Sequence, residues 1–361
     1  MVDAAKSAGL DVVLMALVRK PSKVSTVQYH EFCFDSNIKA VKFLKLTWMI
    51  IRALVFIMTT RCSVIYSINP LAGFLATLCK KNNVKKVYET HEIFPGVRYK
   101  SFSGSFRHIW IGIERFVMNR ADRVYATDPF RMKFLRRFYK VSAEKFDYIL
   151  NAPRSKKIEN ILRASSTVVH YPDIAEYRKR NLKVISYCGG VQRDRGIEAI
   201  ISAVAEFNSD TPSVLYIVGG LEQGYGQELI ELANECGLDR IYFTGAVDNE
   251  NLLKYMSLSD ITFALYARDT VNNRLCSPNK IFDAIQCNVS LIASYSPLAK
   301  LISSHFSSIF LVKKVAVPDL VTALKALSQS VDGVHKKIEV ARSQYSWEQY
   351  EPKLLDAFLK I

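Results

Sequence analysis

The sequence predicts an α/β protein with two doubly wound domains, each a parallel sheet covered by helices on both faces. Short apolar strands alternate with helical segments along most of the chain, which is the pattern that parallel sheets produce. At 361 residues the chain is also too long for one ordinary core. The alternation restarts after a polar segment, residues 154–181, which we interpret as a linker. We therefore expect domains at 1–165 and 166–344.

The first domain opens with a short helix at Asp3–Ala8 and then alternates strands with helices. An apolar run at Leu46–Thr60 contains Arg52 and is shorter than the roughly 20 residues that span a bilayer. We interpret this run as a buried helix. The predicted strands are Asp11–Val18, Ser63–Ser67, Val84–Tyr88, Arg123–Ala126 and Tyr148–Leu150, with helices at 71–81 and 109–119 and from Phe130 onward.

The second domain repeats this alternation. A short amphipathic helix is predicted between Pro278 and Asn288, and Asn288 is a residue type that ends helices in the left-handed conformation. A last helix at Trp347–Leu359 has no strand after it and is free to pack elsewhere. The predicted strands are Lys183–Cys188, Ser213–Val218, Arg240–Phe243, Asp260–Leu265, Val289–Ala293 and Ile309–Val312, with further helices at 197–207 and 227–236.

The charge of the chain is uneven. The net charge is +15, and residues 1–153 have 25 Lys and Arg against 11 Asp and Glu, whereas the remainder has a net charge of only +1. This surplus predicts an anionic partner for the first domain: nucleic acid, an acidic membrane surface or a lipid pyrophosphate. Seven cysteines without a C-x-x-C pair favour reduced thiols in a cytoplasm over disulfides or a zinc site, and we expect no signal peptide.

Glycine pairs follow several strands of the second domain. Glycine lets backbone N–H groups approach a phosphate, a helix N-terminus favours negative charge, and Arg adds a bidentate cation. A single glycine pair is more often a tight turn, and G-x-G-x-x-G is absent, but loops on one sheet edge would line one ligand. The loops are Gly189-Gly190, Gly219-Gly220 and Thr244-Gly245, and Arg195-Gly196 opens a helix.

Lys280 and Asp283 lie three residues apart at the start of the short amphipathic helix, so they share a face. We expect Lys280 to face a phosphate and Asp283 to face sugar hydroxyls of the same ligand. The alternative is a surface salt bridge without a function.

These residues resemble the family 4 glycosyltransferases of GT-B fold, which act in bacterial polysaccharide assembly. The similarity covers most of the chain, including VYETHEIFPG and YILNAP in the first domain and GGVQRDRG, IYFTGAV and SPNKIFDAIQCN in the second. It implies two Rossmann-like domains facing a cleft, with a nucleotide-sugar donor held mainly by the second domain and an acceptor mainly by the first. It also implies that a C-terminal helix, 345–361, crosses back to complete the first domain, and that the site holds no metal or cofactor.

The resemblance assigns roles to individual residues. Arg195 matches the residue that contacts the donor pyrophosphate, and Asp283 matches the second of two acids that bind donor hydroxyls. Asn279 and Lys280 match an SPNK variant of that motif. His91 and Glu92 match the loop that faces the reacting sugar, on the acceptor side, although a lone His beside a Glu is often only a loop hydrogen-bonding residue. The donor-binding candidates are Gly189, Gly190, Arg195, Gly219, Gly220, Thr244, Asn279, Lys280 and Asp283, and the catalytic candidates are His91, Arg195 and Lys280.

Three features depart from the family pattern. Leu275 stands at the position of the first acid, so that role is lost or falls to Asp269 or Asn273. Asn288-Val289-Ser290 stands where the family favours Gly-x-Pro. The usual opening strand and its glycine loop are missing, which leads us to interpret Met1 as an internal methionine of a longer reading frame.

The predicted helix from Phe130 to Lys145 has six basic residues with aromatic and aliphatic residues among them. A solvated helix face is the usual explanation for such a run. Binding to anionic lipid is the functional alternative, and the charge of the whole domain favours it, whereas no nucleic-acid-binding module is recognisable. The candidate membrane contacts are Arg131, Lys133, Arg136, Arg137 and Lys140.

We therefore expect a hexosyl-type glycosyltransferase that moves a sugar from a nucleotide sugar to a growing or polyprenyl-pyrophosphate-linked saccharide. The pathway would be that of a capsule, O-antigen or exopolysaccharide. The expected reaction retains the anomeric configuration, needs no metal and takes place in the cytoplasm at the inner face of the membrane. Two alternatives stay open: a catalytically degenerate GT-B protein that binds a saccharide or a partner, and a nucleotide-sugar epimerase on the same fold.

Overall fold

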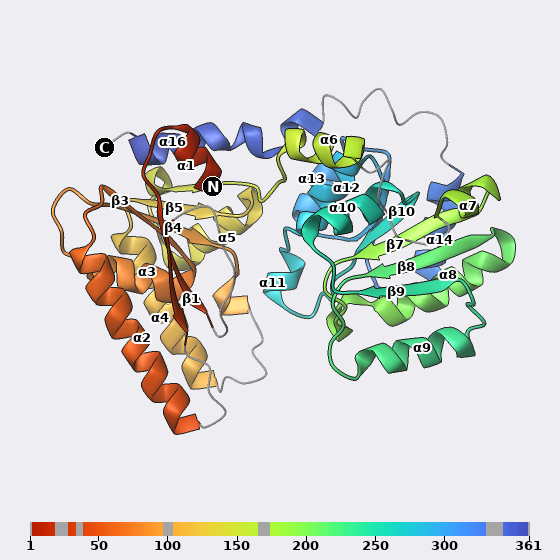
Figure 1. The fold of residues 1–361 in the computed structure, drawn as a ribbon, viewed down its shortest axis with the longest axis horizontal. Coiled ribbons are helices and arrows are strands. Elements are labelled where there is room, and N and C mark those ends of the chain that lie inside the picture. The colour runs from red at the N-terminus through yellow and green to blue at the C-terminus, as the bar shows by residue number, and fades with distance from the viewer. Residues whose placement is uncertain are drawn as a thin grey trace. The chain divides into compact units, whose positions relative to one another are not determined.

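The computed structural model describes residues 2–18, 28–33, 39–96, 104–164, 174–329 and 342–359. The chain forms two compact units, each containing parallel strands and the helices packed on them (Figure 1). Unit 1 comprises residues 1–149 and 350–361, and unit 2 comprises residues 150–349. The α/β class with two parallel-sheet domains is thus confirmed, and the first division falls after residue 149, before the predicted boundary at 165.

The segment predicted as a linker is largely helical where the structure describes it. It contains α6 (Ser155–Ala164) and α7 (Ile174–Lys179). Ile158 and Ile161, about one turn apart on α6, are buried, and α6 packs against two helices of unit 2. The linker prediction is wrong because the polar residues of this segment concealed a narrow apolar stripe.

Unit 1 has a two-stranded sheet of β1 and β2 and a four-stranded sheet in the order β3-β4-β5-β6, all with parallel pairing. The mixed sequence of β2, QYHEFC, gave no strand prediction. The strands are β1 (Val13–Val18), β2 (Gln28–Cys33), β3 (Val64–Ile68), β4 (Lys85–Thr90), β5 (Arg123–Ala126) and β6 (Phe146–Tyr148). The helices are α1 (Val2–Ser7), α2 (Lys39–Thr59), α3 (Asn69–Leu78), α4 (Gly104–Arg120), α5 (Pro129–Tyr139) and α16 (Glu351–Leu359).

Helices cover both faces of the four-stranded sheet. In the register of β3 with β4, Tyr66 and Tyr88 fall on opposite faces. Tyr88 donates a hydrogen bond to Glu114 of α4 (3.0 Å), while the Tyr66 ring lies edge-on against Phe358 of α16. The C-terminal helix therefore packs on unit 1, on the face opposite α4, as the resemblance implied.

α2 is longer than the helix predicted at Leu46–Thr60, and it is buried on one side only. Met49, Ala53 and Ile57 recur every four residues and are 2%, 0% and 7% exposed. Trp48, on the other side, is 62% exposed. The prediction of a buried helix is therefore wrong for half of its surface. Among the described helices, none combines the length and apolar character that a membrane span requires.

Unit 2 has one six-stranded parallel sheet in the order β12-β11-β10-β7-β8-β9. The chain starts at a central strand, runs outward to β9 and returns to the other side of β7, so the strand order reverses between β7 and β10. α8 packs between α9 and α14 on one face, and α10 and α12 pack together on the other (Figure 1). The strands are β7 (Lys183–Cys188), β8 (Ser213–Val218), β9 (Ile241–Gly245), β10 (Ile261–Ala264), β11 (Ser290–Ser294) and β12 (Ile309–Val312). The helices are α8 (Ile197–Asp210), α9 (Tyr225–Glu235), α10 (Asn249–Ser257), α11 (Val271–Arg274), α12 (Asn279–Cys287), α13 (Pro297–Ser303) and α14 (Val317–Ser328).

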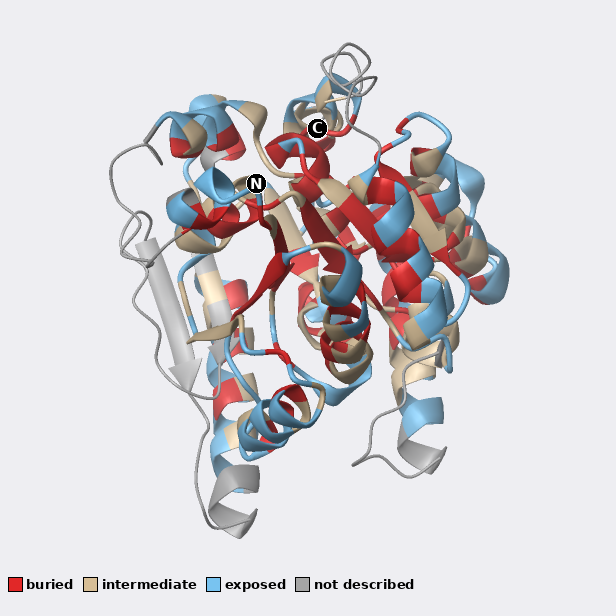
Figure 2. Ribbon diagram, turned by 90° about the vertical axis from the view of Figure 1, so that its right-hand side faces the viewer, coloured by how far each residue is buried: buried red, intermediate tan, exposed pale blue. Residues whose placement is uncertain are grey.

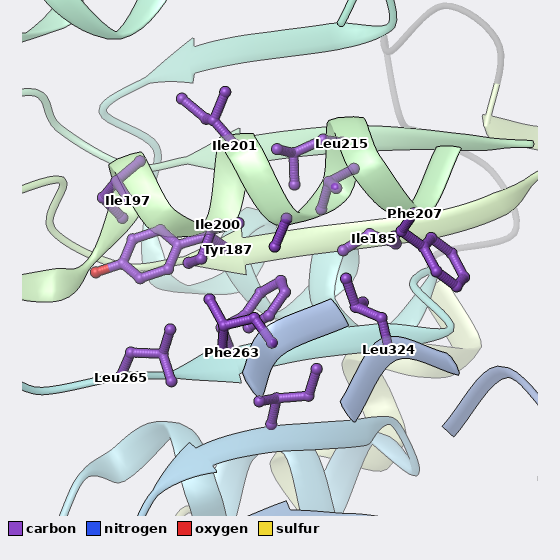
Figure 3. Close-up of a cluster of buried hydrophobic side chains, with 14 of the residues drawn as sticks. Ile185, Tyr187, Ile197, Ile200, Ile201, Phe207, Leu215, Phe263, Leu265 and Leu324 are labelled. Atoms are coloured by element: carbon purple, nitrogen blue, oxygen red, sulfur yellow. The ribbon is translucent and has the colours of Figure 1, made fainter. Parts of the chain in front are cut away.

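The core of unit 2 lies between the sheet and the α8 layer (Figure 3). Ile185 and Phe263 from the strands meet Phe207 of α8 and Leu324 of α14, and all four side chains are fully buried. Buried residues concentrate in the strands, whereas outward helix faces are exposed (Figure 2). The rigid sheet holds the loops at its carboxyl edge in place.

We expect Phe207→Ala to lower the free energy of unfolding of unit 2 by about 3–5 kcal/mol, because it removes a fully buried ring. Urea unfolding followed by circular dichroism measures this change. Ile230→Ala, on an exposed position of α9, is the matched control and should change stability by less than about 0.5 kcal/mol. Equal effects of the two substitutions would contradict this description of the core.

Candidate functional site: the carboxyl edge of the unit 2 sheet

A glycine follows or ends each of the neighbouring strands β7, β8 and β9. The Gly189 N–H donates to the Val218 carbonyl (2.8 Å), and the Gly219 N–H donates to the Gly245 carbonyl (3.1 Å). A Cβ on Gly219 would lie 2.0 Å from the Gly189 oxygen, and both glycines have φ near +140°. Only glycine permits this approach. The backbone itself therefore forms the surface at this edge of the sheet.

Two of the predicted loops continue side by side beyond the strands. The Val191 N–H donates to the Gly220 carbonyl (3.0 Å), and the Glu222 N–H donates to the Val191 carbonyl (3.1 Å). Gly190 and Gly220 are exposed. The structure thus brings together four of the residues predicted from the sequence: Gly189, Gly190, Gly219 and Gly220.

Lys280 reaches this glycine edge from the first turn of α12. Its Nζ lies 2.8 Å, and its Cε 2.5 Å, from the position that a Cβ on Gly189 would occupy. The ammonium also lies 3.8 Å from the centroid of the Tyr187 ring, and the Tyr187 hydroxyl donates to the Gly190 carbonyl (2.8 Å). Tyr187, which sequence reasoning missed, therefore supports both the lysine and the glycine loop.

The environment of Lys280 disfavours its charge. Burial lowers the pKa of the ammonium to about 7, and repulsion from Arg195 contributes in the same direction. A phosphate at this point would add negative charge next to the ammonium and favour its protonated form. The site is therefore electrostatically suited to an anion.

Asp283 lies one turn further along α12. Asn288 follows this helix and has the predicted left-handed conformation (φ 58°). Burial raises the pKa of the Asp283 carboxyl to about 7, and the attraction of Lys280 only partly opposes this effect. Within the described parts of the chain, neither side chain has an ion-pair partner. The surface salt bridge considered as an alternative is therefore not formed.

Arg195 closes the 3-10 turn Arg193–Arg195 just before α8. Its guanidinium stacks 4.4 Å from the centroid of the Tyr266 ring and lies 3.4 Å from an Asp194 oxygen. The side chain is 23% exposed. Repulsion from this guanidinium contributes to the lowered pKa of Lys280.

Thr244 and Asn279, also predicted to bind the donor, have hydrogen bonds within unit 2. The Thr244 hydroxyl donates to the Gly245 carbonyl (3.0 Å), and the Asn279 Oδ1 accepts from Asn151 (3.0 Å). Asn279 is exposed at the start of α12. Both residues therefore lie at the same edge as the glycine loops, although their side chains already have partners.

The position of the missing acid lies just after α11. Asn273 donates to Asp269 (3.3 Å), and Thr270 between them caps α11 by accepting from the Asn273 N–H (3.1 Å). Asp269 is exposed on the loop that follows β10, next to β7 in the sheet. Asp269 therefore lies at the same edge of the sheet as the glycine loops, and its replacement of the missing acid stays a prediction.

In unit 1, His91 follows β4. Its Nε2 lies 2.9 Å from Glu89 Oε1, and the Tyr66 hydroxyl donates to the other oxygen of Glu89. This contact with Glu89 raises the pKa of the imidazole. Arg131 donates to the His91 carbonyl, so both ends of the residue are held. Glu92 is next in the loop, and its carbonyl accepts from the Thr90 hydroxyl (2.9 Å).

A buried carboxyl group lies beneath this loop. Glu114 of α4 is 0% exposed and accepts hydrogen bonds from the hydroxyls of Tyr88 (3.0 Å), Thr90 (2.9 Å) and Tyr139 (2.5 Å). Burial raises its pKa to about 7, against the effect of the three donors. The Glu114 carboxyl thus connects β4, α4 and α5 just before His91. The sequence did not predict this buried cluster.

The predicted basic helix is shorter than expected, and one of its residues is not available. α5 ends at Tyr139, and Lys145 lies in a separate 3-10 turn at Ala143–Lys145. Arg131 is only 5% exposed, because it lies against Asp128 and the His91 loop, so the prediction that it contacts a membrane is wrong. The other candidates remain at least partly exposed: Lys133, Arg136, Arg137 and Lys140.

Comparison with known proteins places this fold among the GT-B glycosyltransferases. The sucrose-phosphate synthase of Thermosynechococcus elongatus superposes with a TM-score of 0.74 at 18% identity, covering 99% of this chain and 90% of that one. WaaG, a glycosyltransferase involved in lipopolysaccharide biosynthesis, gives 0.67 at 14% identity with coverage of 99% and 93%. The Anabaena protein HepE in complex with UDP gives 0.68 at 16% identity with coverage of 93% and 87%. No curated protein matches the sequence.

Two family models match the sequence itself. Residues 1–152 match the model described as Glycosyltransferase Family 4, and residues 182–330 match the model described as Glycosyl transferases group 1. Together the two matches cover most of both units. The chain belongs to the family 4 (group 1) glycosyltransferases.

We expect Glu89→Gln to lower the pKa of His91, because the substitution removes the carboxylate whose hydrogen bond raises it. Titration of the imidazole resonances by nuclear magnetic resonance measures this shift. Glu92→Gln is the matched control, since Glu92 lies nearby but contributes less. A larger shift in Glu92→Gln than in Glu89→Gln would contradict the role assigned to Glu89.

Proposed function

We propose that this glycosyltransferase moves a hexosyl group from a nucleotide sugar to a growing or polyprenyl-pyrophosphate-linked saccharide in cell-surface polysaccharide synthesis. The observation that carries the proposal is the position of Lys280, whose ammonium lies over the glycine edge and is repelled by a second cation, Arg195. Solved structures of similar fold contain UDP or UDP-glucose, which supports a nucleotide-sugar donor.

The leaving pyrophosphate would be stabilised by Lys280 and Arg195. Both side chains are supported by tyrosine rings, so little reorganisation is required when negative charge develops between sugar and phosphate. The exposed backbone of Gly190 and Gly220 allows a phosphate to approach closely, and the start of α12 adds a positive helix dipole. In this proposal the site uses cationic side chains and backbone dipoles, and no metal or cofactor.

The sugar would be held by the carboxyl of Asp283. Its raised pKa favours a protonated acid near neutral pH in the empty site, and a bound donor hydroxyl would restore hydrogen bonds to the buried oxygens. Asp269 is the proposed substitute for the missing first acid. His91, held by Glu89 and Arg131, would position hydroxyl groups of the reacting sugars.

Retention at the anomeric carbon is proposed without a protein base. The bond from the sugar to the leaving phosphate breaks as the acceptor oxygen bonds to the same face, and the departing phosphate oxygen takes the acceptor proton. The protein then has only to position the two substrates and stabilise charge.

A peripheral location at the cytoplasmic face of the membrane fits a lipid-linked acceptor. The exposed basic residues of α5, Lys133 and Arg137, together with the surplus of positive charge in residues 1–153, would attract anionic lipid.

A second candidate function is that of a catalytically degenerate GT-B protein that binds a saccharide. It is favoured by Leu275, whose side chain cannot form a hydrogen bond with a sugar hydroxyl.

Arg195→Ala and Lys280→Ala should each lower kcat/KM by about 100-fold or more for the best donor in a panel of nucleotide sugars, because each removes charge from the leaving group. Arg193→Ala is the matched control, since Arg193 pairs with Glu228 on the exposed surface two residues away. If the wild-type chain neither transfers nor hydrolyses any donor, the enzyme proposal fails and the binding alternative gains support.

The affinity for UDP should fall as the pH rises through about 7, because the lysine whose unliganded pKa lies near this value must be protonated to bind phosphate. Binding should therefore take up a proton above this pH, which calorimetry in buffers of different ionisation enthalpy detects. Lys280→Met should abolish the uptake. Asp283→Asn is the control for the other group that titrates in this range, and uptake that survives Lys280→Met but not Asp283→Asn would contradict the assignment.

A further inference from the structure

α2 presents a continuous apolar stripe that the described part of unit 1 does not cover. Five large side chains recur at intervals of three and four residues, so they lie on one side of the helix. This apolar stripe consists of Leu44, Trp48, Ile51, Val55 and Met58, which are 67%, 62%, 45%, 55% and 60% exposed. Scattered exposed apolar residues are ordinary, but a stripe of five containing Trp marks an interaction surface.

The opposite side of α2 is firmly attached to unit 1. Met49, Ala53 and Ile57 pack with Leu75 of α3 and with Cys79, which directly follows α3, and α3 runs beside α2 (Figure 1). The C-terminal turn is held as well, because Lys81 donates to the Ile57 carbonyl (3.2 Å) and to the Thr60 carbonyl. The apolar stripe is therefore not needed for the core and is displayed on a fixed helix.

The charge of α2 points to an anionic partner. The helix contains four basic residues and no acidic residue. Two of the basic residues, Lys45 and Arg52, are exposed and are seven positions apart, so they flank the apolar stripe on one side. An apolar face bordered by Lys and Arg and containing Trp is the pattern of a helix that lies in the interface of an anionic membrane.

A second copy of the chain fits this surface less well. In a two-fold pairing of α2 with α2, the apolar stripes would meet and the basic flanks would approach like charges, with no acidic residue of the helix to compensate. Anionic lipid headgroups supply that compensation.

We propose that the apolar stripe of α2 inserts into the headgroup boundary of an anionic lipid bilayer, with Lys45 and Arg52 on the phosphates. The proposal rests on the proposed lipid-linked acceptor, and it names the surface that brings unit 1 to it. α5 would contribute electrostatic attraction alone, whereas α2 contributes apolar insertion.

Co-sedimentation of the full chain with vesicles tests this proposal. The wild-type chain should bind vesicles of phosphatidylcholine mixed with phosphatidylglycerol and bind pure phosphatidylcholine weakly. Trp48→Ser combined with Val55→Ser should weaken binding to the mixed vesicles by about tenfold or more, since it removes apolar area that would enter the bilayer. Lys45→Gln combined with Arg52→Gln should weaken binding and reduce its salt dependence.

Two controls make the result interpretable. Ile230→Ser combined with Leu301→Ser removes exposed apolar side chains of unit 2 and should leave vesicle binding unchanged. Thermal unfolding should be unchanged in the α2 variants, because the replaced residues are exposed. Bromine atoms on the lipid acyl chains should quench the fluorescence of the wild-type chain more than that of Trp48→Phe, which should still bind.

The proposal is overturned if the variant with both Trp48→Ser and Val55→Ser binds mixed vesicles as tightly as the wild type does. This conclusion holds also if neutralising Lys133 and Arg137 weakens binding while that variant binds normally, because α5 would then be the membrane contact. It is also overturned if the wild-type chain dimerises without lipid and this variant is monomeric. UDP binding, measured on the same samples, tests the proposed function separately from the membrane surface. If the wild-type chain binds UDP but not vesicles, only the α2 surface is rejected. If the wild-type chain does not bind UDP, the proposed function is rejected.

Discussion

The close approach of Gly189 and Gly219 is the constraint on which the proposed donor site depends. The two backbones come together at the ends of adjacent strands, in a space that a single Cβ on Gly219 would fill. Because Gly189 has no side chain either, Lys280 can extend across it to the Tyr187 ring. Cation–π contacts contribute about 0.5–2 kcal/mol, enough to fix the position of the ammonium while burial weakens its charge. The sheet thus positions a cation that gains stability when an anion arrives.

At the corresponding edge of the unit 1 sheet, a residue is held in position by hydrogen bonds and not by a close approach of glycines. His91 has no glycine cradle and is held instead by polar contacts from three directions: Glu89 on the ring, Arg131 on the carbonyl, and the Glu114 cluster beneath the preceding strand residue. Buried polar groups of this kind are stabilising only when each has its partner. The arrangement explains why Arg131, which lies in a run of basic residues, faces inward while its neighbours face solvent.

The surface of unit 1 also separates two kinds of positive charge. The basic residues of α5 alternate with aromatic residues, of which Phe134 and Phe138 stack on each other. Those of α2 border a stripe of large apolar side chains. The basic residues of α5 would therefore attract anionic lipid from a distance, whereas those of α2 would bind lipid headgroups at the edge of an apolar surface.

Much of the fold could be predicted from local patterns. Strands such as Lys183–Cys188 and Ser213–Val218 are short apolar runs bounded by polar or glycine residues, and their limits were predicted correctly. Asn288 was correctly expected to end its helix in the left-handed conformation, because few residue types tolerate it. The family motifs singled out Arg195, Lys280 and Asp283 as donor-binding candidates, and this role stays a prediction.

Only the tertiary structure determines which side of each helix or strand packs against another element. The apolar run of α2 predicted burial, but α3 covers only one side of it, and packing partners distant in sequence leave no local signal. Arg131 and Glu114 are ordinary helix residues in the sequence and become buried only because β4, α4 and α5 converge on them. The tyrosines beneath Lys280 and Arg195 were missed for the same reason. Periodicity determines that an element has faces, whereas contacts across the fold determine what each face does.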